Sequence, residues 1–375
     1  MRVNIGPVLV QERKKRGITQ QQLADFIGVS KAAVSKWETG QTYPDITLLP
    51  ALAAYFDLRI DDLLDYEPQL AAKEIHSIYA SLKQSVTTEP GEKVLARLRS
   101  LVRRYYACYP FLEQMGMWLL NHFDQLPGKD TPSKLQAYIP EAQQLFVRVR
   151  KNAPDSQLKM RARNMEAYTM VILNKPAAVL DLLGTFTPEY LPSESLIASA
   201  QQMLGETDQA QATYQSALYQ ATSVVASYFT NYLQMLLADP QRFAETYRRA
   251  RAFAAVFDLA RLNPLVYCNL LGSAAAGFAQ QKQPDQVFAV LTDYAAAYQA
   301  TTFPVTLHGD AYFDKIGPWL DQLDIGTQTP RNTALVEQSL RDVILNNPVF
   351  TAYHDDPRWA DIAAAMRPKE KNNHE

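Results

Sequence analysis

Basic side chains are concentrated at the start of this 375-residue chain: residues 1–44 hold seven lysines and arginines against three acidic residues. Residues 45–67 reverse the balance, with one arginine against six acids. A local positive surface attracts phosphate groups, and added salt weakens that attraction. Because the whole chain has a net charge of −2, we expect any contact with a polyanion to be confined to the first segment.

The sequence contains no recognisable motif for catalysis or metal binding. We find no glycine-rich phosphate loop, zinc-type cysteine and histidine spacing or nucleophile elbow. His308, Asp310 and Asp314 are the closest approach to a metal site. Asp310 is better explained as the N-cap of a helix that carries Tyr312 and continues to Leu320. We therefore predict that the chain is not an enzyme and has no cofactor and no metal.

Two short amphipathic segments flank Gly28 and form the elements that must present these basic residues. Thr19 and Gln22 have the spacing of a capping box that begins the first helix, and Ser30 can cap the second. Glycine at position 28 supplies the backbone freedom that the turn requires. The pattern predicts a helix-turn-helix with its second helix at residues 30–39, of the type that enters a DNA major groove. The inward-facing positions are Leu23, Ala24, Ile27, Val34 and Trp37.

Three further helices complete a domain predicted at residues 1–66. An apolar stripe containing Ile5 and Leu9 predicts a first helix that Gly17 ends. Asp45 is a plausible N-cap for a fourth helix, and a short fifth helix follows. The fourth helix is expected to bury Ile46, Leu49, Leu52, Ala53 and Phe56, which recur at helical spacing.

Residues 5–64 resemble the phage-repressor and Cro-like helix-turn-helix family, often called the XRE family. The resemblance lies in R-K-K-R-G-I-T-Q-Q-Q-L-A at residues 13–24, G-V-S-K-A-A-V-S-K-W-E-T-G at residues 28–40, and the helices ending I-D-D-L-L at residue 64. It implies a five-helix domain that binds double-stranded DNA. It also implies a homodimer on an inverted-repeat operator.

The resemblance assigns DNA contacts to the second motif helix and its surroundings. In that family, the exposed face of the second motif helix approaches the edges of the DNA bases. A lysine there can donate to guanine, and an alanine methyl can touch a thymine methyl. Arg13 and Glu38 match a structural pair in the family. The alternative for Lys31 and Lys36 is that they are ordinary solvated charges. The predicted DNA contacts are Gln20, Lys31, Ala32, Ser35, Lys36, Thr39, Gln41, Thr42 and Tyr43.

Helical periodicity continues through the rest of the chain, which predicts an all-α protein. Residues 67–92 form a predicted helical linker that either pairs with its symmetry mate or docks on the next domain. Residues 93–366 show antiparallel helices separated by short loops, many containing proline, such as the loop expected at Pro140. Residues 367–375 are predicted to be a disordered tail.

One unit of this array, Ser195–Leu218, resembles a tetratricopeptide (TPR) repeat. Aligning it with weaker copies pairs Val179, Ala210, Phe243 and Val287, at spacings of 31, 33 and 44 residues. Only the middle spacing approaches the usual repeat of about 34 residues. We therefore predict a TPR-like solenoid that acts as a sensor and dimerisation domain.

The combination of domains resembles bacterial regulators that bind short signalling peptides in a TPR groove. That resemblance implies a ligand, possibly a peptide or protein, with contacts at Arg161, Asn164, Tyr168 and Asn269. The alternative is an interaction scaffold that tethers a partner protein to DNA without a small effector. Two cysteines, Cys108 and Cys268, and the lack of a signal peptide or membrane-length apolar run favour a cytoplasmic location.

Overall fold

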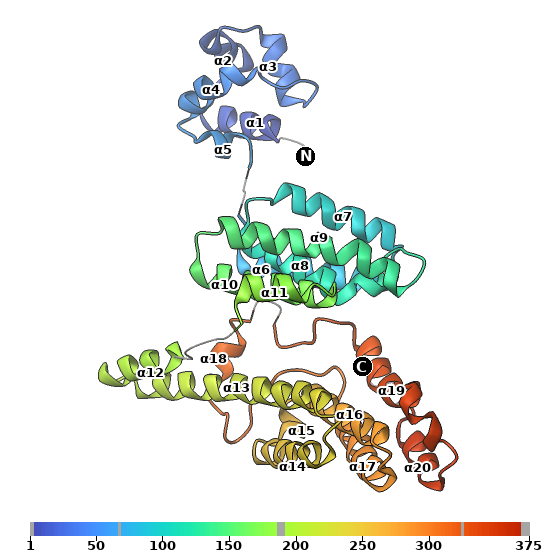
Figure 1. The fold of residues 1–375 in the computed structure, drawn as a ribbon. Helices are drawn as coiled ribbons and strands as arrows, with labels where there is room; N and C mark the ends of the chain where they lie inside the picture. The colour runs from blue at the N-terminus through green and yellow to red at the C-terminus, as the bar shows by residue number, and fades with distance from the viewer. Residues whose placement is uncertain (1–3, 67–68, 186–191, 324–325, 369–375) are drawn as a thin grey trace, which may run out of the picture.

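The computed structural model describes residues 4–66, 69–185, 192–323 and 326–368. Within these ranges every regular element is a helix, and the extended backbone forms one isolated bridge between Thr306 and Gln328. The predicted all-α fold class is confirmed. Figure 1 shows the helix-turn-helix domain at the N-terminus, followed by a middle unit of helices α6 to α11 and a C-terminal unit of α12 to α20.

The helix-turn-helix domain packs five short helices around one small core. Leu9, Leu23, Val34, Leu52 and Leu63 are fully buried in it. Burying these side chains is what holds such short helices together, since each is too short to be stable alone. Its helices are α1 (Ile5–Lys15), α2 (Gln20–Ile27), α3 (Lys31–Glu38), α4 (Leu49–Phe56) and α5 (Ile60–Leu63).

The start of the fourth helix differs from the prediction. Asp45 accepts a hydrogen bond from the Thr47 amide at 2.9 Å, but the turn it caps is a 3-10 helix over Ile46–Leu48. The regular helix α4 begins at Leu49. Because a 3-10 turn has a tighter period than an α-helix, the predicted inward position of Ile46 was wrong, and its side chain is 78% exposed.

The middle unit has its own core and includes the helix that was predicted as a linker. Ile75, Tyr79 and Leu82 of the first helix are buried against the next helices. Of the two roles left open for this helix, docking on the following unit is the one observed. The unit comprises α6 (Ala72–Thr88), α7 (Gly91–Arg104), α8 (Tyr109–His122), α9 (Thr131–Asn152), α10 (Ser156–Ile172) and α11 (Pro176–Leu183).

Proline does not break the chain at every predicted position. Pro140 lies inside α9, so the loop expected there was wrong. Ile139, Ala142 and Phe146 are fully buried on either side of it, and this burial keeps the helix continuous despite the missing amide donor.

The C-terminal unit encloses a second core rich in aromatic residues. Phe243 packs edge-on against Phe278 with ring centroids 4.9 Å apart, and a Cβ at Gly277 would overlap the Phe243 ring. Close helix packing here depends on the small residue Gly277. The long helices are α12 (Ser193–Met203), α13 (Thr207–Met235), α14 (Pro240–Val256), α16 (Pro264–Gln280), α17 (Pro284–Ala300) and α19 (Thr333–Leu345); α15 (Leu259–Leu262), α18 (Gly317–Leu320) and α20 (Pro357–Ala365) are shorter.

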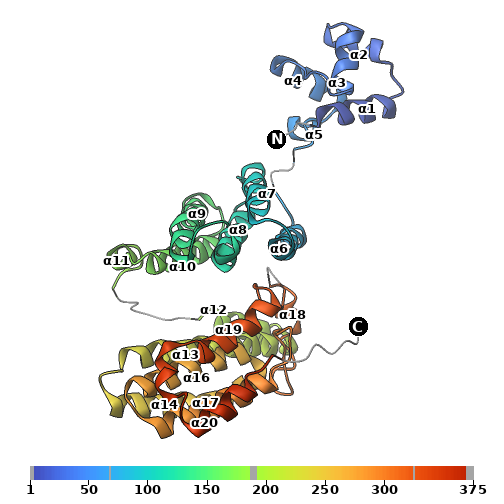
Figure 2. The ribbon, with the colours of Figure 1, turned by 90° about the vertical axis from the view of Figure 1, so that its right-hand side faces the viewer.

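The two helical units have separate hydrophobic cores, and Figure 2 shows their helices as two separate groups. The division of the chain at residues 66, 92 and 366 stays a prediction, and the predicted tail falls largely on residues 369–375, outside the described residues.

Asp310 accepts from the Tyr312 and Phe313 amides at 2.9 and 2.8 Å, but it caps a turn, because the next helix begins only at Gly317. The helix predicted directly after Asp310 was therefore wrong.

Candidate nucleic-acid interface

Local hydrogen bonds determine where the helix-turn-helix begins and turns. The Thr19 hydroxyl accepts from the Gln22 amide at 3.2 Å, and the Gln22 side chain accepts from the Thr19 amide at 2.8 Å. Gly28 has a φ of +80°, and the Ser30 hydroxyl accepts from the Ala33 amide at 3.2 Å. These contacts satisfy amides that a helix start leaves unpaired. The predicted caps are thus present, and the turn positions α3 against α2.

The inner face of α3 is anchored in the domain core. Val34 is fully buried and Trp37 is 5% exposed. At the end of α3, α1 approaches so closely that a Cβ on Gly6 would lie 2.6 Å from the Trp37 carbonyl oxygen. The sequence prediction missed this contact. A glycine inside a helix, where it costs stability relative to alanine, was the available signal.

An ion-pair network joins α1, α2 and the end of α3. The Arg13 Nε donates to one Glu38 oxygen at 2.6 Å, and its Nη2 donates to the other at 3.0 Å. The Gln20 side-chain Nε2 also donates to Glu38, at 2.8 Å. Burial opposes ionisation of Glu38, but the hydrogen bonds from Arg13 and Gln20 outweigh it and lower the pKa of the carboxyl group. The network therefore holds α3 in place, with Gln20 as one of its members.

The outer face of α3 is open to solvent. Lys31, Ala32 and Lys36 are exposed, and Ser35 is half-buried. No carboxylate in the described part of the chain forms an ion pair with either lysine, whereas nearby Arg16 pairs with Asp57 at 2.6 Å. A rigid helix thus presents two available cations and a methyl group on one face.

The loop after α3 is tied back to that helix. The amides of Gln41 and Thr42 donate to the Lys36 carbonyl at 2.9 and 3.3 Å, and the Thr39 hydroxyl donates to the Ser35 carbonyl at 2.9 Å. The side chains of Gln41, Thr42 and Tyr43 are exposed. The structure therefore brings the loop residues predicted for phosphate contact beside the outer face of α3.

The residues predicted for ligand contact lie in two different helices. Arg161, on α10, pairs with buried Glu113 at 2.7 Å, while Asn164 and Tyr168 of the same helix are exposed. Asn269, on α16, borders a small hollow against α19. The structure does not gather these four residues into one site, and their ligand role stays a prediction.

Comparison with known proteins identifies the N-terminal domain. The family described as Helix-turn-helix matches residues 9–63. The HTH-type transcriptional activator BcrR of Enterococcus faecalis is 39% identical over 66 residues, which are 18% of this chain and 32% of that protein. The HTH-type transcriptional regulator AnsR of Bacillus subtilis (strain 168) is 36% identical over 61 residues, which are 16% of this chain and 53% of that protein. The chain thus spans only about a third to a half of the length of these relatives.

Two solved structures align with longer parts of the chain at low similarity. Bacillus thuringiensis PlcR in complex with the peptide PapR7 and DNA aligns over 68% of this chain and 96% of that chain, with 15% identity and a TM-score of 0.23. The apo form of ComR from S. Thermophilus aligns over 79% and 94%, with 12% identity and a TM-score of 0.22. Alignments this weak do not establish a common arrangement of the units.

Proposed function

Because residues 9–63 form a helix-turn-helix domain like that of HTH-type transcriptional regulators, we propose that this chain is a sequence-specific DNA-binding regulator of transcription. The observation that carries the proposal is the outer face of α3, where Lys31, Ala32 and Lys36 are exposed on a helix whose opposite face is buried. A helix held in this way enters the major groove, and its side chains read base edges.

The neighbouring groups supply contacts to the DNA backbone. Thr39, Gln41, Thr42 and Tyr43 lie beside the outer face of α3 and offer donors to phosphate oxygens. Such contacts position a protein on the duplex without reading its sequence. We infer that the regulator binds as a homodimer on an inverted-repeat operator, and that a ligand or partner on the helical units modulates it. We propose a cytoplasmic location, because bacterial chromosomal DNA lies there and the relatives are bacterial proteins.

The first experiment selects binding sites from a random duplex library with the full-length chain. We expect an inverted repeat to be enriched and its half-sites to lie about one helical turn apart. Failure to enrich any sequence at low salt would argue strongly against the proposal.

A second experiment tests α3 as the reading element. The double variant Lys31→Ala, Lys36→Ala should weaken binding to the selected site by roughly 10-fold or more, since a specific base contact contributes about 1–3 kcal/mol. The matched control is Lys129→Ala, Lys151→Ala, which removes two exposed lysines from the middle unit. Equal affinity of both variants at matched salt would show that α3 does not read the DNA.

A further inference from the structure

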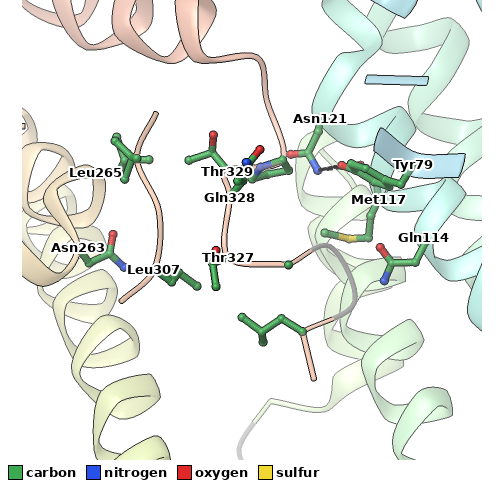
Figure 3. Close-up of a pocket in the computed structure, with 14 residues that line it drawn as sticks. Tyr79, Gln114, Met117, Asn121, Asn263, Leu265, Leu307, Thr327, Gln328 and Thr329 are labelled. Carbon is green, nitrogen blue, oxygen red and sulfur yellow. Dashed lines mark hydrogen bonds between the residues drawn. The ribbon is translucent and has the colours of Figure 1, made fainter. Parts of the chain in front are cut away.

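A cavity of about 440 Å³ lies between the middle and C-terminal units. Figure 3 shows α6 and α8 on one side, contributing Tyr79, Met117 and Asn121, and the C-terminal chain on the other, with Leu265 and Leu307. Cavities at the boundary between two units are common places for small-molecule sites, which usually measure about 300–1,000 Å³. The volume is therefore suited to a small molecule.

Contacts between the two units build the wall of this cavity. The Lys83 ammonium group of α6 donates to the Thr329 carbonyl at 2.6 Å. Arg331 pairs with Asp124, which follows α8. Residues 326–330 therefore form a strap that is fastened to the middle unit beside the cavity.

The lining selects a particular chemistry. Its described side chains include no charged group. Met117, Leu265, Val305, Leu307 and Leu323 make the surface mainly apolar, and side chains such as Gln114, Asn263 and Gln328 add neutral polar groups. Among the described lining residues a charged ligand would find no ion-pair partner to offset the hydration it loses, which is costly. An uncharged, mostly apolar molecule avoids this cost.

One buried hydroxyl gives the cavity a polar contact. Tyr79 is 2% exposed and lines the cavity, and its hydroxyl oxygen accepts a hydrogen bond from the Asn121 side-chain Nδ2 at 3.4 Å. Burial raises the pKa of Tyr79 to about 12, against the opposing effect of that hydrogen bond. The phenol thus stays protonated at neutral pH and keeps its own hydrogen to donate, and within the described residues no acceptor is found for it.

We propose that this cavity binds a small, uncharged, mostly apolar molecule whose acceptor oxygen receives a hydrogen bond from Tyr79. The occupant contacts α6 and the C-terminal unit together, so it stabilises their docked arrangement. Since α6 is the first helix after the helix-turn-helix domain, occupancy biases how that domain is presented to DNA. This last step rests on the proposed function, whereas binding in the cavity does not.

Binding is tested with the uncharged dye Nile red and the full-length chain, without DNA. We expect a saturable rise in emission, displaced by 1-octanol and at least 10-fold less effectively by octanoate at pH 7.5. Met117→Trp, which fills the cavity, should weaken dye binding at least 10-fold. Val256→Trp, at a position 78% exposed outside the cavity, should leave it unchanged.

A second variant keeps the test decisive if Met117→Trp fails to fold. Tyr79→Phe preserves the ring and removes the donor, so it should weaken octanol binding about 5-fold or more. The proposal would be overturned if dye emission did not saturate, or if Val256→Trp and a folded Met117→Trp bound the dye equally. It would also be overturned if octanoate displaced the dye as well as octanol does, or if Tyr79→Phe bound octanol with unchanged affinity.

The effect on DNA is measured separately. Saturating octanol should change the affinity for the selected operator at least 3-fold, and not in Met117→Trp. Dye binding without DNA binding would refute the proposed function alone. DNA binding without cavity-dependent dye binding would refute the cavity alone, and cavity binding that leaves operator affinity unchanged would refute the coupling.

Discussion

The substitution Glu38→Gln tests whether buried charge holds α3 in place. The Glu38 side chain is 5% exposed and that of Arg13 is 14% exposed, with a shortest contact of 2.6 Å. The pair of Arg16 and Asp57 has the same shortest contact, 2.6 Å, but its side chains are 35% and 86% exposed. The buried carboxylate also accepts two hydrogen bonds from Arg13 and one from Gln20, whereas Asp57 accepts one from Arg16. The exposed pair is therefore the weaker control in both burial and hydrogen bonding.

The expected magnitude follows from that burial. Hydrogen bonds to charged groups contribute about 1.5–3 kcal/mol when their partners are withdrawn from water. Glutamine preserves the size of Glu38 but leaves the Arg13 guanidinium without its counter-charge. We expect a loss of about 2 kcal/mol, or roughly 30-fold in the local opening equilibrium. Asp57→Asn should cost no more than about 0.5 kcal/mol, because exposed ion pairs contribute little.

Hydrogen exchange with mass spectrometry measures this opening directly in the full-length chain. Peptides covering α3 should exchange roughly 30-fold faster in Glu38→Gln and at most about twofold faster in Asp57→Asn. Asparagine tolerates the φ of +55° at position 57, so the control adds little backbone strain. Equal effects of the two substitutions, or less than a threefold change in Glu38→Gln, would refute the argument.

Three further predictions concern the packing and the titrating groups. Gly6→Ala should destabilise the helix-turn-helix domain by about 1–3 kcal/mol, because the new methyl group meets the Trp37 carbonyl. Faster hydrogen exchange of α1 would report this loss of stability. The control Gly317→Ala, where a Cβ meets nothing within 4 Å, should not accelerate the exchange of α1. The stability difference between wild type and Glu38→Gln should be full above the unfolded carboxyl pKa of about 4.3 and shrink as pH falls through the lower folded pKa; a difference that grew with acid would contradict this. Burial raises the pKa of Cys268 to about 12, so iodoacetamide at pH 8 should leave this thiol unmodified until the chain is denatured, as mass spectrometry of its peptide will show.

Local signals in the sequence were sufficient for the helix-turn-helix. Thr19 and Ser30 act as caps, and Gly28 adopts a positive φ, because each depends only on neighbouring residues. The pairing of Arg13 with Glu38 was reached through resemblance and is confirmed by the hydrogen bonds between them. The exposed lysines of α3 followed from helical periodicity once its buried face was known.

Local signals were insufficient where packing overrides them. Ile46 has the spacing of a core residue but lies on a 3-10 turn that rotates it outward. Pro140 usually ends a helix, yet buried neighbours on both sides carry α9 through it. In both cases the outcome depends on contacts that a short stretch of sequence does not contain.

The amino-acid sequence by itself determined that this chain is helical and that a helix-turn-helix lies at its N-terminus, since caps, turns and periodicity act over a few residues. Only the tertiary structure decided that α6 packs into the middle unit and that a strap borders a cavity beside Tyr79. Lys83 and Thr329, which fasten that strap, are 246 positions apart. Contacts of such separation leave no local pattern, because they form only after each unit has folded and its surfaces meet.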